Sequence, residues 1–135
     1  MWAEILPLAH CAATWFMVGL IWFVQVSHYP LFRLADPVAY VPAHIRRTTL
    51  VVAPPMLLEL ALSVLLVWSR PGPLAWTGLA LLFFVWLSTA LLQVPIHRRL
   101  ARGFEAAPHR RLVRTNWIRT VLWSARGAVA MGILA

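Results

Sequence analysis

Long apolar stretches dominate the pattern of hydrophobic and polar positions along this chain of 135 residues. Three of them are long enough to cross a lipid bilayer as a helix, which takes about 20 apolar residues. A fourth stretch, near the end of the sequence, is equally long but is interrupted by Arg119 and Arg126. The pattern therefore predicts four membrane-spanning helices, at about 5–27, 46–69, 73–96 and 109–134.

The segments between these helices contain residues that end or turn helices. Residues 69–73 read Ser-Arg-Pro-Gly-Pro, which predicts a tight turn between the second and third helices. The other two connections are longer, and we expect loops over 28–44 and 97–109. Because connections of this length leave consecutive helices antiparallel, the sequence predicts an all-α, integral membrane, up-down-up-down four-helix bundle. Residues 1–135 then form a single transmembrane domain.

The composition agrees with a membrane protein and differs from that of a soluble domain. Only 12% of the residues are charged and 61% are hydrophobic, whereas soluble domains have about 25% charged residues. The formal net charge is +8, and every basic residue is an arginine. A basic chain often binds nucleic acid, but most of these arginines lie in short loops beside the spans, as charges that set membrane topology do. We therefore expect the lipid bilayer as the partner, and no nucleic acid.

The arginines are divided unevenly between the two ends of the predicted bundle. Only Arg70 lies on the side of the tight turn, while eight arginines lie on the side of the two longer loops. The positive-inside rule therefore places the longer loops in the cytoplasm and both termini outside. The eight arginines are Arg33, Arg46, Arg47, Arg98, Arg99, Arg102, Arg110 and Arg111.

The last predicted helix carries a stripe of large polar side chains. Its members follow one another at steps of three, four and three residues, which keeps them on one face of a helix. A charged group at membrane depth is costly and normally faces a bundle interior or a water-filled cavity. We therefore expect the stripe to mark the working interior of the bundle. It consists of Asn116, Arg119, Trp123 and Arg126.

Two opposite charges are expected deep inside the bundle. At 1.5 Å of rise per residue, Glu59 and Arg126 lie at a similar depth, about 20–27 Å from the cytoplasmic helix ends, and so does His10. An unpaired charge would be costly there, so we predict a buried ion pair between Glu59 and Arg126, with His10 nearby. The alternative is that Arg126 extends along its long stem to the outer surface.

Each predicted helix has one histidine at its cytoplasmic end. In an antiparallel bundle these four ends converge, and imidazole is a common ligand of zinc, copper and iron. The histidines are therefore candidate ligands of a transition metal (copper, iron or zinc) or of haem, with His28 and His97 the best placed. The alternative is that they are unligated interfacial or hydrogen-bonding residues. The four are His28, His44, His97 and His109.

A glutamine lies about one helical turn inside two of these histidines. Gln25 shares a helix face with His28, and Gln93 shares one with His97. These amides are candidates for binding a polar ligand or for supporting metal ligands from behind. We expect Tyr29, which follows His28 at the end of the first predicted helix, to anchor the chain at the membrane interface.

The second half of the chain resembles a group of small four-helix bacterial membrane proteins related to the anthrone oxygenase family. The resemblance rests on a proline and a polar residue that close the third helix, Pro95 and His97, and on an Asn-x-x-Arg that opens the fourth, Asn116 and Arg119. Relatives often have asparagine where this chain has His97. The resemblance implies a multi-pass protein of the bacterial cytoplasmic (inner) membrane that inserts oxygen into a phenolic or quinone-like small molecule.

Together these features predict a site for a small lipophilic or quinone-like molecule inside the bundle, near its cytoplasmic face, with redox chemistry of the oxygenase type. Arg119 would hold an anionic oxygen, His97 would be a base or a metal ligand, and Asn116 would be the third catalytic residue. The expected substrate-binding residues are Gln25, Gln93 and Trp123.

Two other functions fit the same sequence. The first is a non-catalytic binder of a small anion or a lipid headgroup, which would use Arg119 and Asn116. The second is an accessory subunit of a larger membrane complex, or a homo-oligomer, in which the polar stripe faces a partner helix. The glycines do not favour the second, because no two of them stand four apart on one helix.

Overall fold

Helical segments make up almost all of the chain that the structure, a computed structural model, describes. The description covers residues 2–34 and 37–135, without the side chains of 2, 3, 33, 37–42 and 45, so that of Arg33 lies outside it. Segments η1 and η3 are π-helical and η2 is a 3₁₀ helix. The segments are α1 (Trp2–Phe23), η1 (Val24–His28), α2 (Tyr29–Leu31), η2 (Phe32–Leu34), α3 (Pro37–Ser69), α4 (Pro73–Ser88), η3 (Thr89–Gln93), α5 (Val94–Arg102) and α6 (Ala106–Leu134).

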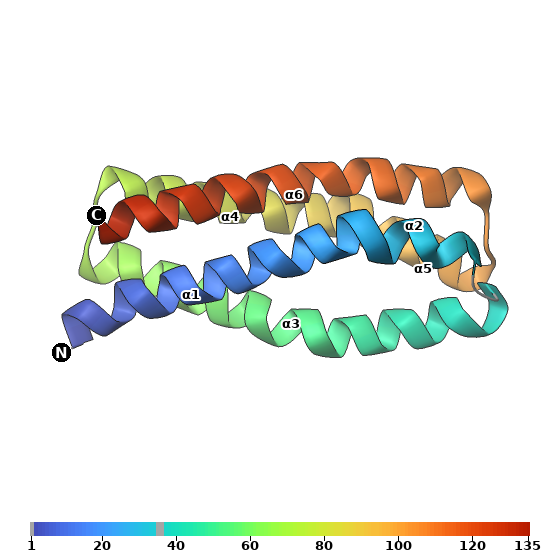
Figure 1. Cartoon of the computed structure of the whole chain (residues 1–135), viewed down its shortest axis with the longest axis horizontal. Coiled ribbons are helices and arrows are strands. Elements are labelled where there is room, and N and C mark those ends of the chain that lie inside the picture. Colours follow the sequence, from blue (N-terminus) through green and yellow to red (C-terminus); the bar gives the residue numbers. More distant parts are fainter. Residues whose placement is uncertain (1, 35–36) are drawn as a thin grey trace.

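These segments form four long rods, and each rod runs antiparallel to the one before it in the chain (Figure 1). The first rod runs from α1 to η2, the second is α3, the third runs from α4 to α5, and the fourth is α6. Helix α6 packs against α1 and α4, and α3 packs against the same two helices from the other side. Both termini lie at one end of the bundle, together with the turn between α3 and α4 (Figure 1). The all-helical four-helix bundle that the sequence predicts is confirmed.

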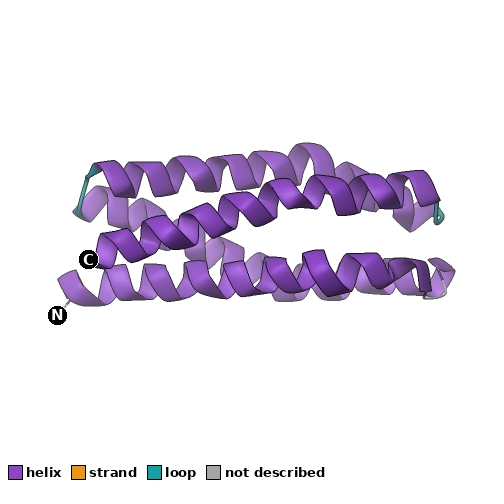
Figure 2. Cartoon of the chain, turned by 45° about the horizontal axis from the view of Figure 1, so that its top comes forward, coloured by secondary structure: helices purple, strands orange, loops and turns teal. Residues whose placement is uncertain are grey.

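Two predicted loops are much shorter than the sequence indicated, and the rods are helical to their ends (Figure 2). The first rod stays helical as far as Leu34 and α3 begins at Pro37, so most of the expected loop over 28–44 is helix. The expected loop over 97–109 is likewise reduced to residues 103–105. Proline is well suited to the first position of a helix, because its fixed φ is already helical and its missing N–H would have no partner there. This explains why Pro37 begins a helix.

Both π-helical segments stand two residues before a proline. Segment η1 ends at His28, before Pro30, and η3 ends at Gln93, before Pro95. A proline ring clashes with the carbonyl group four residues earlier, and for both prolines that carbonyl lies inside the π-helical segment. The wider π turn relieves the clash, and its extra residue rotates the following segment relative to the preceding helix. The sequence pattern predicted regular helices over both of these segments, so the two π turns are a difference from that prediction.

Three of the rods are long and apolar enough to cross a membrane, over Glu4–Leu31, Arg46–Ser69 and Pro73–Arg102. Helix α6 has 29 residues, enough for a span, but its arginines make it less apolar. Two of them, Arg119 and Arg126, are buried inside the bundle. Large apolar side chains on all four rods are exposed, which is the pattern of a surface that faces lipid.

The interior of the bundle is polar to an unusual extent. Buried polar groups are stable only when they are hydrogen-bonded, and inside a membrane the partners must come from the bundle itself. The buried polar side chains form two networks along α6, one around Arg119 and one around Arg126, about two helical turns apart. The buried polar residues include Thr14, Gln25, Glu59, Ser63, Gln93, Asn116, Arg119, Thr120 and Arg126.

Candidate functional site

A cavity of about 320 Å³ lies inside the bundle, and all four rods contribute to its wall. A mostly apolar cavity with a few converging polar groups is the usual form of a small-molecule site. The apolar part of the wall includes Met17, Ile21, Val52, Met56 and Trp123. The polar part includes Tyr29, Thr48, Thr89, Gln93, His97 and Arg119.

Arg119 reaches this cavity from α6 with its charge uncompensated. The residue is only 6% exposed. Its Nε and Nη2 donate to Oδ1 of Asn116, at 3.0 and 2.5 Å, and its remaining bonds are to the hydroxyl groups of Thr89 and Tyr29, both at 3.4 Å. All of these partners are neutral, and no carboxylate among the described side chains pairs with Arg119. A buried guanidinium in this state favours an anionic group on any molecule that occupies the cavity.

Asn116 and Gln25 support Arg119 from behind. The Nδ2 of Asn116 donates to Oε1 of Gln25 at 2.9 Å, and Nε2 of Gln25 donates to the backbone carbonyl of Val113 at 3.2 Å. Neither side chain belongs to the cavity wall. Their position therefore suits orientation of the guanidinium, and the predicted direct contacts of Gln25 with a substrate and of Asn116 with the reacting atoms stay predictions.

His97 and Tyr29 form a hydrogen-bonded pair on the cavity wall. The Tyr29 hydroxyl lies 2.8 Å from Nε2 of His97, and it also accepts the bond from Arg119. Either member of the pair can donate, depending on the tautomer of the imidazole. The expectation that Tyr29 is an interfacial anchor is wrong, because the residue is buried. It lies four residues after the buried Gln25, on the same face of the rod.

Three residues of the wall carry a buried polar atom that has no hydrogen-bond partner among the described residues. These atoms are Nε2 of Gln93, Nε1 of Trp86 and Nδ1 of His97. Gln93 is only 1% exposed, and the hydroxyl of Ser88 donates to its Oε1 at 3.2 Å. A buried donor without an acceptor costs about 1–3 kcal/mol. Acceptor oxygens on a bound molecule would relieve this cost.

The four histidines do not assemble into a group of metal ligands. Nε2 of His28 lies 2.8 Å from Nδ1 of His44, and the rings of His44 and His97 are stacked with centroids 5.9 Å apart. His109 lies apart from them and bonds through Nε2 to the backbone carbonyl of Tyr29 at 2.8 Å. Within the described part of the chain, no three His, Cys, Asp or Glu side chains are grouped as metal ligands. The described side chains therefore do not show the predicted convergence of all four histidines, and binding of copper, iron, zinc or haem stays a prediction. His28 contacts His44, whereas the sequence favoured His28 and His97 as the best-placed ligands.

The burial of His44, together with its contact with His28, should make the stability of the fold depend on pH. His44 precedes the membrane-spanning segment of α3, and burial together with repulsion from His28 and His97 lowers its pKa to about 3. In the unfolded chain this pKa is about 6.5. The folded state therefore has its full stability with respect to His44 above about pH 6.5, where this imidazole is neutral in both the folded and the unfolded chain. It loses stability as the pH falls from there towards 3, because the unfolded chain takes up the proton first.

We expect the melting temperature of the wild type to fall between about pH 7.5 and pH 5, and that of His44→Gln to fall less. Glutamine can keep a hydrogen bond to His28 but does not take up a proton. Thermal unfolding followed by tryptophan fluorescence at both pH values measures the difference. An equal fall in the two proteins would contradict the assignment to His44.

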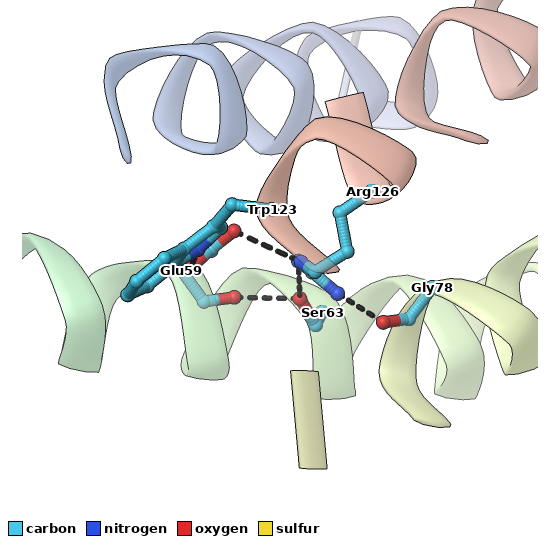
Figure 3. A network of polar contacts seen from close by, with 5 residues as sticks. All are labelled: Glu59, Ser63, Gly78, Trp123 and Arg126. Atoms are coloured by element: carbon cyan, nitrogen blue, oxygen red, sulfur yellow. Dashed lines mark hydrogen bonds and ion pairs between the residues drawn. The ribbon is translucent and has the colours of Figure 1, made fainter. Parts of the chain in front are cut away.

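A second buried network contains the predicted ion pair (Figure 3). Nη2 and Nε of Arg126 lie 3.0 and 3.1 Å from Oε1 of Glu59, and Nε1 of Trp123 donates to Oε2 of Glu59 at 3.0 Å. Arg126 also donates to the hydroxyl of Ser63 at 3.1 Å and to the backbone carbonyl of Gly78. The side chains of Arg126 and Glu59 are 1% and 0% exposed. The alternative in which Arg126 reaches the outer surface is therefore wrong.

Trp123 connects this network to the cavity. Its indole N–H is used by Glu59, so the ring offers the cavity its apolar surface and no hydrogen bond. The guanidinium carbon of Arg119 lies 5.9 Å from the centroid of the ring, within the range of a cation–π contact. The predicted neighbour His10 is buried and interacts electrostatically with Arg126. Trp123 is thus held in place by the network around Arg126, while its ring forms part of the wall of the cavity beside Arg119.

The arrangement combines a fixed positive charge, a hydroxyl group and an imidazole on the wall of a mostly apolar cavity. Arg119 can stabilise an ionised oxygen, and His97 and Tyr29 can move a proton to or from a bound molecule. Four residues predicted for the site line the cavity, namely Arg119, His97, Gln93 and Trp123, whereas Tyr29 was not predicted as a site residue. One signal for Tyr29 was its position four residues after Gln25, which places both side chains on one face of a helix.

The predicted relationship to anthrone oxygenases rests on four residues, of which His97 and Arg119 line the cavity and Asn116 lies directly behind it. The fourth, Pro95, follows the π turn of η3. Comparison of the chain with protein-family models, with curated proteins and with solved structures finds no match.

Proposed function

We propose that this protein binds a small lipophilic molecule with an acidic oxygen, such as a phenol, an enol or a hydroxyquinone, and catalyses its oxygenation. The observation that carries the proposal is the buried, uncompensated charge of Arg119 on the wall of a mostly apolar cavity. A neutral apolar ligand would leave that charge unpaired, and a strongly hydrated anion would lose its water against Met17 and Trp123. A ring with one ionisable oxygen suits both parts of the wall.

In the proposed reaction, His97 removes a proton from a CH₂ group that is activated by a neighbouring carbonyl. Arg119 and Tyr29 stabilise the oxygen of the resulting enolate, which carries the negative charge. The enolate carbon then reacts with molecular oxygen and becomes a second carbonyl, and one molecule of water leaves. The balance is CH₂ plus O₂ to C=O plus H₂O, and it needs no further oxidant or reductant.

In the proposed setting, all four rods cross the bacterial cytoplasmic membrane, with both termini outside and the histidine end in the cytoplasm. The length and apolar character of three rods support this arrangement. The fourth, α6, suits a membrane because Arg119 and Arg126 are directed into the bundle and away from lipid. The excess of arginines at the end of the bundle opposite the termini supports the orientation with that end in the cytoplasm. A lipophilic substrate partitions into the same membrane.

The binding step is tested with Arg119→Gln in lipid nanodiscs, with 2-hydroxy-1,4-naphthoquinone as the probe. Trp86 and Trp123 line the cavity, so a bound quinone is expected to quench tryptophan fluorescence. A hydrogen bond to a charged group contributes about 1.5–3 kcal/mol. We therefore expect Arg119→Gln to weaken binding by about 10- to 100-fold. Arg114→Gln is the matched control, because Arg114 is exposed on the same helix, and it should leave binding unchanged.

The reaction itself is tested by oxygen uptake with anthrone, relative to nanodiscs without protein. Uptake by the wild type that Arg119→Gln loses and Arg114→Gln keeps would support the oxygenase. Probe binding without oxygen uptake would reduce the proposal to a non-catalytic binder. Equal binding of the probe by the wild type and Arg119→Gln would overturn both the oxygenase and the non-catalytic binder that depends on Arg119.

A further inference from the structure

A second hollow lies at the end of the bundle opposite the termini, where the apolar span Pro73–Arg102 ends. Its volume is about 610 Å³, and it is formed by one side of α5 and by the connection over 103–105 that leads to α6. It shares no residue with the interior cavity. Three arginines line it, and Glu105 is the one acidic residue among the lining residues.

One of the three arginines is already neutralised. Nε and Nη2 of Arg99 donate to the two carboxylate oxygens of Glu105, at 2.8 and 2.6 Å. This bidentate pair holds the connection against the helix and uses up the acidic group of the hollow. The pair therefore shapes the hollow and contributes no net charge to it.

The other two arginines keep their charge. Arg98 and Arg102 stand four residues apart on α5, so they lie on the same side of the helix, and both are exposed. The opposite side of α5 is fixed in the bundle through the buried residues Ile96 and Leu100. No carboxylate among the described side chains forms an ion pair with either arginine. Two like charges at this spacing repel each other, and an anion that binds between them removes the repulsion.

We infer that this hollow binds the phosphate group of an anionic phospholipid. The apolar span that contains α5 ends at Arg102, so the two arginines lie at the depth of lipid headgroups. The same rod exposes Leu91 and Val94 directly before the hollow, and an acyl chain attached to the phosphate can lie along this apolar surface. The planar fork of a guanidinium matches the oxygens of a phosphate group. This site does not depend on the function proposed for the interior cavity.

The test measures how much phosphatidylglycerol or cardiolipin stays bound to the purified full-length protein, by native mass spectrometry. The double variant Arg98→Gln with Arg102→Gln is compared with Arg47→Gln with Arg111→Gln. The control removes two exposed arginines that line no part of the hollow, so both variants lose the same charge. Both variants lose the same diffuse attraction to anionic lipid, so a difference between them reports direct contacts of the two guanidinium groups with the phosphate. We expect the first variant to retain at least about tenfold less anionic lipid than the control.

Equal retention in the two variants would overturn the inference, because it would mean a diffuse attraction by the whole basic end. Displacement of the lipid by millimolar inorganic phosphate would also overturn it in favour of a site for free phosphate. Phosphatidylcholine, which carries no net charge, should be retained equally by all variants. If the double variant does not fold, Arg98→Gln and Arg102→Gln are measured singly, and each is expected to lose part of the retention.

Discussion

Glu59→Gln is expected to lower the free energy of unfolding by about 3–5 kcal/mol, because it leaves the guanidinium of Arg126 buried without a counter-charge. The carboxylate of Glu59 accepts hydrogen bonds from both Arg126 and Trp123, and the pair is almost fully buried. Glutamine has nearly the same shape and can still accept one of these bonds, so the loss reports the missing charge. Reversible unfolding by a denaturing detergent in mixed micelles, followed by tryptophan fluorescence, measures the effect.

Two comparisons separate the unpaired charge from other damage. Glu59→Leu together with Arg126→Met removes both charges, and replacement of a buried pair by apolar residues of similar size is often nearly neutral. We therefore expect this double variant to recover most of the lost stability. Glu4→Gln removes the same charge from an exposed position on α1 and should have almost no effect. A double variant as unstable as Glu59→Gln would show that the unpaired charge is not the cause.

The ion pair could be predicted because it depends on depth alone. In a regular helix depth follows from the residue count, and Glu59 and Arg126 are the two full charges at that level. The stripe on α6 could be predicted for a similar reason, since the spacing of Asn116, Arg119 and Trp123 lies within one uninterrupted helix. All three are buried, as expected. The number of helices followed in the same way from the length of the apolar stretches.

The parts of the site that could not be predicted lie where the helices stop being regular. The π turn of η1 directly precedes Tyr29, which was assigned from its place at a helix end and not from the helix face that it shares with Gln25. The position of His44 depends on α3 beginning at Pro37, inside what the sequence indicated was a loop. That early start brings His44 to His28 and leaves His97 to bond with Tyr29. Which histidines meet thus depends on where α3 begins, and a pattern of hydrophobic positions does not contain this.

His97→Gln is expected to slow oxygen uptake by about 10²–10⁴-fold, the usual contribution of a general base, while it leaves binding of the hydroxyquinone probe nearly unchanged. Glutamine can still bond to the hydroxyl of Tyr29, which lies 2.8 Å from Nε2 of His97, but it does not take up a proton. The charge of Arg119, on which binding of the probe is proposed to depend, stays in place. The effect should therefore appear in kcat and hardly in KM.

His28→Gln is the matched control for this prediction, because His28 lies at the same end of the bundle and is not part of the cavity wall. It should keep both oxygen uptake and probe binding. Probe binding and oxygen uptake that fall together in His97→Gln would mean that His97 holds the ligand and does not take its proton. Unchanged uptake would remove His97 from the reaction. Tyr29→Phe would then decide between Tyr29 and Arg119, because it removes the hydroxyl group that bonds to both His97 and Arg119. In this variant Arg119 alone of these two residues could stabilise the ionised oxygen of the substrate.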